Sequence, residues 1–216
     1  MLNIVFDCDG TLVDSEPLHN RADVDVLARY GVFLDPLVHR KRATGIGRPA
    51  MLRVIEQEHA ITLPEDTEQQ IEAELHRLVE LQLTLIPSVP EVLDEFAARG
   101  ARMAVASNSH RIYIERALKR CNIRKFFSDR IASCDVVENM KPAPDLYLLA
   151  ATLLEAPPSL CVAVEDSKVG VASAYAAGMR TIGFCPADHP FTPDQLKQAG
   201  AESIITDFRQ LLHVLL

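Results

Sequence analysis

The first 14 residues, MLNIVFDCDGTLVD (1–14), decide how the rest of the chain is interpreted. Residues 4–6 are consecutive apolar residues, which is typical of a buried strand, and aspartates follow at positions 7, 9 and 14. Carboxylates held together at the end of an apolar strand are costly unless a positive group lies among them. The stretch therefore indicates either a cation site or a solvated turn, and the remaining sequence has to distinguish the two.

Composition limits the classes of protein that fit. The 216 residues carry a net charge of −8 and 48% hydrophobic side chains, which is typical of a soluble globular protein with a core. No run rich in lysine and arginine is present, so neither nucleic acid nor an anionic membrane is the expected main partner. The five cysteines are scattered and form no CxxC pair, and no signal-peptide pattern precedes Asp7. These features predict reduced thiols and a cytoplasmic protein.

The pattern changes at about residue 87. Residues 16–86 show only helical periodicity, which predicts helices over 16–30, 49–59 and 64–83 and no strand. Beyond that point strand and helix patterns alternate. We expect strands at 103–106, 130–133, 161–165, 181–184 and 203–205, with helices at 89–99, 111–121, 144–154 and 168–177. The prolines at 186, 190 and 193 mark a loop. Such alternation predicts an α/β fold with a doubly wound parallel sheet. The predicted domains are an α/β core (1–15 and 87–216) and an inserted all-helical cap (16–86).

Four polar stretches accompany the predicted strands. They are DCDGT (7–11), SNS (107–109), KPAPD (141–145) and VEDS (164–167). Ligands of open α/β sheets bind at the carboxyl ends of the strands, so these stretches are expected to meet. Together they supply acids for a cation, a hydroxyl and helix-start amides for oxyanions, and a lysine. That combination is what a phosphate–metal centre requires.

In this order, the four stretches resemble the haloacid dehalogenase superfamily of phosphohydrolases, and the helical insertion resembles its subfamily with a small helical cap. The resemblance implies that Asp7 attacks phosphorus and becomes an aspartyl-phosphate. It implies that Asp9 protonates the leaving oxygen and then activates water. The phosphate-binding residues that it implies are Thr11, Ser107, Asn108 and Lys141. It also implies Mg²⁺, held by the Asp7 carboxylate, the Asp9 backbone carbonyl and Asp166, with Glu165 nearby.

The same residues also have plainer interpretations. A lone DxDG is as often a simple turn, but four stretches in order are not explained that way. A calcium loop of the EF-hand type fails on register, because Gly10 stands at the fourth position instead of the sixth. Ser107 fits a helix cap as well as a phosphate ligand, and both roles are compatible. Glu165 fits a structural role, and Asp166 is the stronger candidate for a direct metal ligand.

Members of the superfamily catalyse several reactions, and individual residues help to distinguish them. Asp9 disfavours a dehalogenase, and Lys41 does not stand in the context of a phosphonate hydrolase lysine. Ser15, His19 and Arg48 match cap and hinge positions at which β-phosphoglucomutase-like members hold sugar phosphates.

The sequence favours a Mg²⁺-dependent phosphatase acting on a small phosphate ester, in particular a sugar or sugar-acid phosphate. A sugar phosphate mutase is the alternative, which Thr11 disfavours because the mutase motif has valine there. A phosphate-binding protein that no longer turns over is the other alternative. Monomer and small homo-oligomer both stay open.

Overall fold

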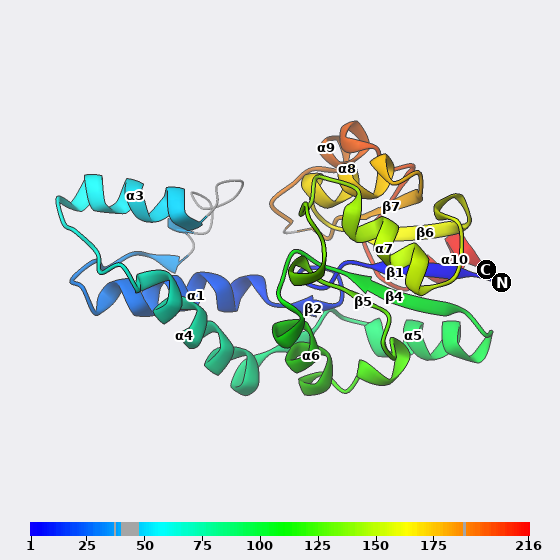
Figure 1. Cartoon of the computed structure of the whole chain (residues 1–216), viewed down its shortest axis with the longest axis horizontal. Coiled ribbons are helices and arrows are strands. Elements are labelled where there is room, and N and C mark those ends of the chain that lie inside the picture. Colours follow the sequence, from blue (N-terminus) through cyan, green and yellow to red (C-terminus); the bar gives the residue numbers. More distant parts are fainter. Residues whose placement is uncertain (37, 40–47, 188) are drawn as a thin grey trace. The chain divides into compact units, whose positions relative to one another are not determined.

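The computed structural model describes residues 1–36, 38–39, 48–187 and 189–216. The chain divides into two compact units, Met1–Asp14 with Thr84–Leu216, and Ser15–Leu83. We call them the α/β unit and the helical unit (Figure 1). In chain order the described elements are β1 (Asn3–Phe6), β2 (Val13–Asp14), α1 (Glu16–Ala28), α3 (Arg48–His59), α4 (Thr67–Gln82), β3 (Thr84–Leu85), α5 (Val89–Ala98), β4 (Arg102–Ala106), α6 (Arg111–Arg120), η1 (Arg124–Phe126), β5 (Ile131–Ala132), η2 (Cys134–Val136), α7 (Asp145–Leu153), η3 (Pro158–Leu160), β6 (Cys161–Glu165), α8 (Lys168–Ala176), β7 (Arg180–Phe184), α9 (Pro193–Ala199), β8 (Ser203–Ile205) and α10 (Gln210–Leu215).

The α/β unit is built on one six-stranded sheet in which every neighbouring pair is parallel. The strand order is β5-β4-β1-β6-β7-β8. The predicted doubly wound parallel sheet is thereby confirmed. Because β1 lies between β4 and β6, the carboxyl ends of these three strands are neighbours. The polar stretches that follow them are therefore brought to the same edge of the sheet.

Alternate residues of β1 pack on opposite faces of the sheet, as strand geometry requires. Val5 belongs to a cluster of small apolar residues shared with α7 and α8. Phe6 stacks instead with Phe208 and meets the edge of Phe127, at ring distances of 6.1 and 6.2 Å. Figure 1 shows α7 and α8 on one side of the sheet and α5 and α6 on the other. The hydrophobic run at the start of the chain is thus buried on both faces.

Two short strands were not predicted. Val13–Asp14 and Thr84–Leu85 pair antiparallel as β2 and β3, at the points where the chain leaves and re-enters the α/β unit. The expectation that 16–86 contains no strand is wrong at its end. A two-residue strand is too short to show the alternation by which strands are recognised in sequence. These two segments pair only when distant parts of the chain fold together.

Two helices near the carboxyl terminus were also missed. The predicted proline loop ends at α9, where Pro193 stands in the first turn instead of in a loop. Thr192 and Gln195 form a reciprocal capping box at its start, which is a recognisable sequence signal. The short α10 follows β8 and buries Leu211. A proline marks a loop in many sequences, but here Pro193 begins a helix.

The helical unit packs α1 against α4, and a second apolar cluster joins the end of α1 to α3. Leu27, Met51 and Ile55 are buried in this cluster. Ser15 occupies the N-cap position of α1 as predicted, but its side chain makes no capping hydrogen bond. Helix α4 begins at Thr67, three residues later than predicted. Among the described residues, no helix is long and apolar enough to cross a membrane.

Candidate active site

A buried lysine joins the ends of β1 and β6. Lys141 Nζ donates to Asp7 Oδ1 and to Glu165 Oε1, both at 2.6 Å, and to the backbone oxygen of Ala106 at 2.9 Å. The side chains of Lys141 and Glu165 are 4% and 0% exposed. Burial alone would lower the pKa of Lys141, but Asp7 and Glu165 outweigh it and raise the pKa. The lysine is therefore held as a cation at the edge of the sheet.

Glu165 has both carboxylate oxygens occupied. Oε1 accepts from Lys141 and from the hydroxyl of Tyr147 at 3.0 Å, and Oε2 accepts from the amide and hydroxyl of Ser167, each at 3.0 Å. Gly170 lies so close that a Cβ there would stand 1.6 Å from Oε1. Because its oxygens already have these partners, Glu165 is placed to orient Lys141. Among the metal-binding residues predicted from the sequence, Glu165 is the one that these contacts favour least.

Asp166 completes the acidic group. Single oxygens of Asp7, Glu165 and Asp166 lie within 4.8 Å of one another. Burial raises the pKa of Asp166 to about 6, although a hydrogen bond with His189 opposes the rise. His189 Nε2 lies 3.3 Å from Asp166 Oδ2, and Thr11 Oγ1 lies 3.5 Å from Oδ1.

These residues fit a divalent cation. Burial also raises the pKa of Asp7, and the neighbouring carboxylates of Glu165 and Asp166 add to the rise while Lys141 opposes it. Three carboxylates facing one ammonium leave negative charge uncompensated. Carboxylate oxygens are the ligands that Mg²⁺ prefers. Asp7 and Asp166 are the side chains in the best position to supply them.

Asp9 is held by the segment that follows β4. Its Oδ1 accepts from the hydroxyl of Tyr113 at 2.7 Å, and its Oδ2 accepts from Ser109 Oγ at 2.9 Å. Gly10 has a φ of +81°, a left-handed conformation that glycine adopts readily. A Cβ on Gly10 would lie 2.2 Å from Asp166 Oδ2. The turn therefore needs glycine both for its backbone and for its closeness to the acids.

The predicted phosphate-binding residues lie together in the α/β unit. Ser107 is buried, and its hydroxyl accepts from the amide of Ser109 at 3.0 Å. Asn108 Oδ1 accepts from the amide of Lys141 at 2.9 Å, which ties the second stretch to the third. Thr11 is fully buried. Each of these side chains stands at the carboxyl edge of the sheet.

The cap residues lie in the helical unit. Arg48 Nε donates to Asp23 Oδ1 at 3.0 Å, and the other oxygen of Asp23 lies 3.1 Å from His39 Nε2. Ser15 is buried at the start of α1, and His19 lies within that helix. Lys41 lies outside the described residues.

The side chains that contact Asp9 or the acidic group and were missed in the sequence include Ser109, Tyr113, Tyr147 and His189. Tyr113 and Tyr147 stand on helix faces that the apolar pattern assigns to the core, and both are buried. His189 belongs to the segment in which the prolines at 186, 190 and 193 predict a loop. Only Ser109 had a signal, because it ends the SNS stretch.

The fold and these contacts define a class of hydrolase. The chain belongs to the haloacid dehalogenase-like hydrolase family, whose model matches residues 1–178. It is 33% identical over 187 residues to 6-phosphogluconate phosphatase of Escherichia coli, covering 86% of this chain and 83% of the relative. Hexitol phosphatase B of the same organism is 33% identical over 184 residues, covering 84% and 82%.

A solved structure described as a putative β-phosphoglucomutase from Thermotoga maritima superposes with a TM-score of 0.86 at 29% identity. The match covers 100% of this chain and 98% of that one. Together with the family match, the curated relatives confirm the resemblance drawn from the four stretches. They also confirm the prediction that the chain is an enzyme, a phosphatase of this family.

Proposed function

We propose that this enzyme is a Mg²⁺-dependent phosphatase that hydrolyses a sugar or sugar-acid phosphate through an aspartyl-phosphate on Asp7. The single observation that carries the proposal is the buried ion-pair group, in which Lys141 Nζ lies 2.6 Å from Asp7 and 2.6 Å from Glu165 beside Asp166. Phosphate monoesters resist hydrolysis because charge must be neutralised and the reacting atoms aligned. A buried cation beside a carboxylate nucleophile supports both requirements.

The proposed reaction has two displacements. First, a carboxylate oxygen of Asp7 forms a bond to phosphorus while the bond to the leaving oxygen breaks, and Asp9 gives that oxygen a proton. Water then attacks phosphorus and gives its proton to Asp9, while the bond between phosphorus and Asp7 breaks. Inorganic phosphate leaves, and both carboxyl groups return to their initial protonation states.

The other residues bind and orient the reacting groups. Lys141 offsets the charge of the transferring phosphoryl group, and Ser107, Asn108 and the amide of Thr11 bind its oxygens. The hydroxyls of Ser109 and Tyr113 hold the Asp9 carboxylate in one orientation. Mg²⁺, held by Asp7, the backbone oxygen of Asp9 and Asp166, supplies further charge neutralisation when bound.

The substrate class rests on the relatives and on the cap residues. The two curated relatives named above are phosphatases of 6-phosphogluconate and of hexitol phosphates. In our proposal Ser15, His19 and Arg48 contact the sugar part of the substrate. Arg48 suits a carboxylate or a second phosphate there, because a guanidinium fork binds either group bidentately. The proposal keeps a cytoplasmic location, in line with the five free cysteines, and a monomer or small homo-oligomer.

A sugar phosphate mutase is the second candidate, favoured by the likeness to the putative β-phosphoglucomutase structure. The two reactions differ in their product. A phosphatase releases inorganic phosphate, whereas a mutase moves the phosphoryl group between two positions of the sugar and releases almost none.

The test is phosphate release from a panel of sugar, sugar-acid, glycolate and nucleotide monophosphates, with Mg²⁺ and with a chelator. We expect Mg²⁺-dependent release that is concentrated on sugar or sugar-acid phosphates. Isomerised sugar phosphate without release would establish the mutase instead. Neither product from folded, Mg²⁺-supplied protein would contradict both reactions.

A further inference from the structure

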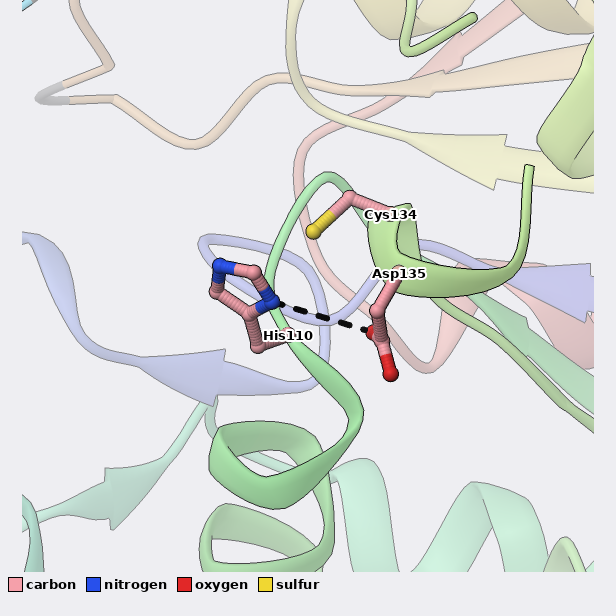
Figure 2. A group of neighbouring side chains, drawn as sticks. All are labelled: His110, Cys134 and Asp135. Atoms are coloured by element: carbon pink, nitrogen blue, oxygen red, sulfur yellow. Dashed lines mark ion pairs between the residues drawn. The ribbon is translucent and has the colours of Figure 1, made fainter. Parts of the chain in front are cut away.

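A second group of metal-ligating side chains lies outside the acidic group at Asp7. His110 immediately precedes α6, and Cys134 and Asp135 begin the η2 turn that follows β5. Figure 2 shows the side chains of His110, Cys134 and Asp135 near one another where these two segments approach, with the ion pair between His110 and Asp135 dashed. Their ligand atoms all lie within 4.8 Å of one another. The proposed phosphatase reaction uses none of the three.

The spacing of the three atoms suits a small ion after a modest rotation of the side chains. His110 Nδ1 lies 4.0 Å from Asp135 Oδ1. In a tetrahedral zinc site with bonds of ~2.0–2.2 Å, a nitrogen and an oxygen ligand stand ~3.4 Å apart, so these two atoms have to approach each other by ~0.6 Å. The side chain of His110 is 64% exposed, so its ring has room to turn.

Backbone contacts hold the two segments against each other. The amide of Cys134 donates to the backbone oxygen of Ser109 at 3.3 Å, next to His110. On the other side of His110, the amide of Arg111 donates to Asp135 Oδ1 at 2.9 Å. The hydrogen bonds therefore flank the histidine and fix where the thiol and the carboxylate stand relative to it. Such a framework lowers the ordering cost of binding an ion.

The donor atoms of these three side chains determine which kind of metal ion fits the group. A sulfur, an imidazole nitrogen and a carboxylate oxygen are the ligands of zinc and of similar transition metals, whereas Mg²⁺ takes oxygen. The group at Asp7 offers oxygen alone from its three carboxylates. The chain therefore presents two sites whose ligand chemistries differ.

We propose that His110, Cys134 and Asp135 bind one zinc-class divalent ion, with the fourth position left to water or to a ligand. An ion there joins η2 to the residues that precede α6. This segment also contains Ser107 and Asn108, which the proposed reaction uses, and Ser109, which contacts Asp9. Binding is nevertheless a property separate from turnover and is measured without substrate.

Cobalt(II) is the probe, because a bond from cobalt to thiolate gives a charge-transfer absorption that oxygen ligands do not give. The full-length protein is titrated with Co²⁺ in excess Mg²⁺, so that the carboxylates at Asp7 are occupied by the harder ion. We expect the thiolate band to saturate at about one equivalent and Zn²⁺ to abolish it by competition. Absence of the band in the wild-type protein would overturn the proposal.

Variants assign the ligands. Cys134→Ser is expected to remove the band, and His110→Ala to weaken Co²⁺ binding by about 10-fold or more. Cys121→Ser, which changes a half-buried thiol elsewhere, is the matched control and keeps the band. Asp166→Asn also keeps it, because that carboxylate belongs to the other group. A band that persists in Cys134→Ser, with the fold checked by circular dichroism, would contradict the assignment.

Discussion

Two groups of acids and bases in this chain differ in their exposure to water. In the α/β unit, the side chains of Lys141, Asp7 and Glu165 are 4%, 10% and 0% exposed. In the helical unit, Glu74 is itself only 10% exposed, but it lies 3.2 Å from Arg29 and 2.5 Å from Arg77, whose side chains are 50% and 54% exposed. We call these three residues the exposed group because of the two arginines. The contacts are of similar length, so distance does not separate the two groups.

Burial determines how strongly the charges within each group interact and how much hydration they lose. Charges removed from water interact strongly but lose hydration, and such a pair is weak evidence for stability. Exposed pairs are screened by water and contribute little. The buried group is therefore best explained by chemistry that requires a lysine and carboxylates in a dry place. The exposed group contributes modestly to the stability of its own unit.

The largest expected effect is the loss of the proposed nucleophile. Asp7→Asn removes the attacking oxygen charge but keeps the size of the side chain, and Lys141 retains Glu165 as a partner. We expect kcat to fall by about 10⁴-fold or more with the fold intact, measured by phosphate release and circular dichroism. Asp129→Asn, at a 99% exposed carboxylate, is the control and leaves kcat unchanged. Turnover that survives in Asp7→Asn would end the aspartyl-phosphate mechanism.

The next largest effect is expected when a methyl group is added beside the buried carboxylate of Glu165. In Gly170→Ala the new methyl group would stand 1.6 Å from Glu165 Oε1, so the carboxylate has to give up some of its partners. We expect the free energy of unfolding to fall by ~1–3 kcal/mol in urea denaturation, and phosphate release to fall with it. Val169→Ala, at a partly exposed neighbour on α8, separates this effect from a change in helix propensity. Equal stability of the Gly170→Ala and wild-type proteins would show that Glu165 is not held as described.

A smaller effect concerns the orientation of Asp9. Tyr113→Phe removes the hydroxyl that donates to Asp9 Oδ1 at 2.7 Å and leaves the buried ring in place. Acid–base catalysis contributes ~10²–10⁴-fold, and part of this depends on orientation. We expect kcat to fall by about 10-fold with KM unchanged.

The control for this variant is Tyr175→Phe, at a 66% exposed tyrosine, which is expected to leave both constants unchanged. A loss of stability in Tyr113→Phe without any loss of kcat would make Tyr113 a packing residue only. The comparison of kcat with KM therefore distinguishes positioning from packing.

The smallest effect belongs to the exposed group and depends on pH. The hydrogen bond from Arg77 lowers the pKa of Glu74 below its usual range, and Arg29 adds to this effect. A lowered pKa in the folded state stabilises the protein above the unfolded pKa of ~4.3, and that contribution disappears as the pH falls through the folded value. We expect Glu74→Gln to cost about 1 kcal/mol at pH 7, and less below pH ~4, in urea denaturation. A cost that does not change with pH would assign the effect to packing.

The sequence indicated most of the sheet but not every element around it. The central strands are recognisable because they are continuous apolar runs buried on both faces. The β2–β3 pair was missed because its partners lie about 70 positions apart in sequence and each has only two residues. Helix α9 was missed for a different reason: its capping box at Thr192 and Gln195 lies among prolines, which are also typical of a loop.

The residues of the candidate site also fall into two sets, those that local sequence patterns indicate and those that they do not. Local patterns were enough to select Asp7, Asp9, Ser107 and Asp166, which follow strands closely, and Lys141, which lies in the stretch before α7. Tyr113 contacts Asp9 from 104 positions away, and on a helix face a tyrosine looks like any other core residue. Tyr147 was hidden in the same way, whereas His189 lies between β7 and α9, in a segment that the prolines indicate to be a loop.

By itself, the sequence determined the family, the sheet and the strand-end residues, because these depend on local periodicity and on order along the chain. The tertiary structure decided which of the acids share Lys141, that Glu165 is surrounded by donors, and that a histidine, a cysteine and an aspartate meet beside α6. Burial and the direction of a side chain arise only when distant segments pack together. They therefore determine which carboxylates lie beside the buried lysine and which one pairs with half-exposed arginines.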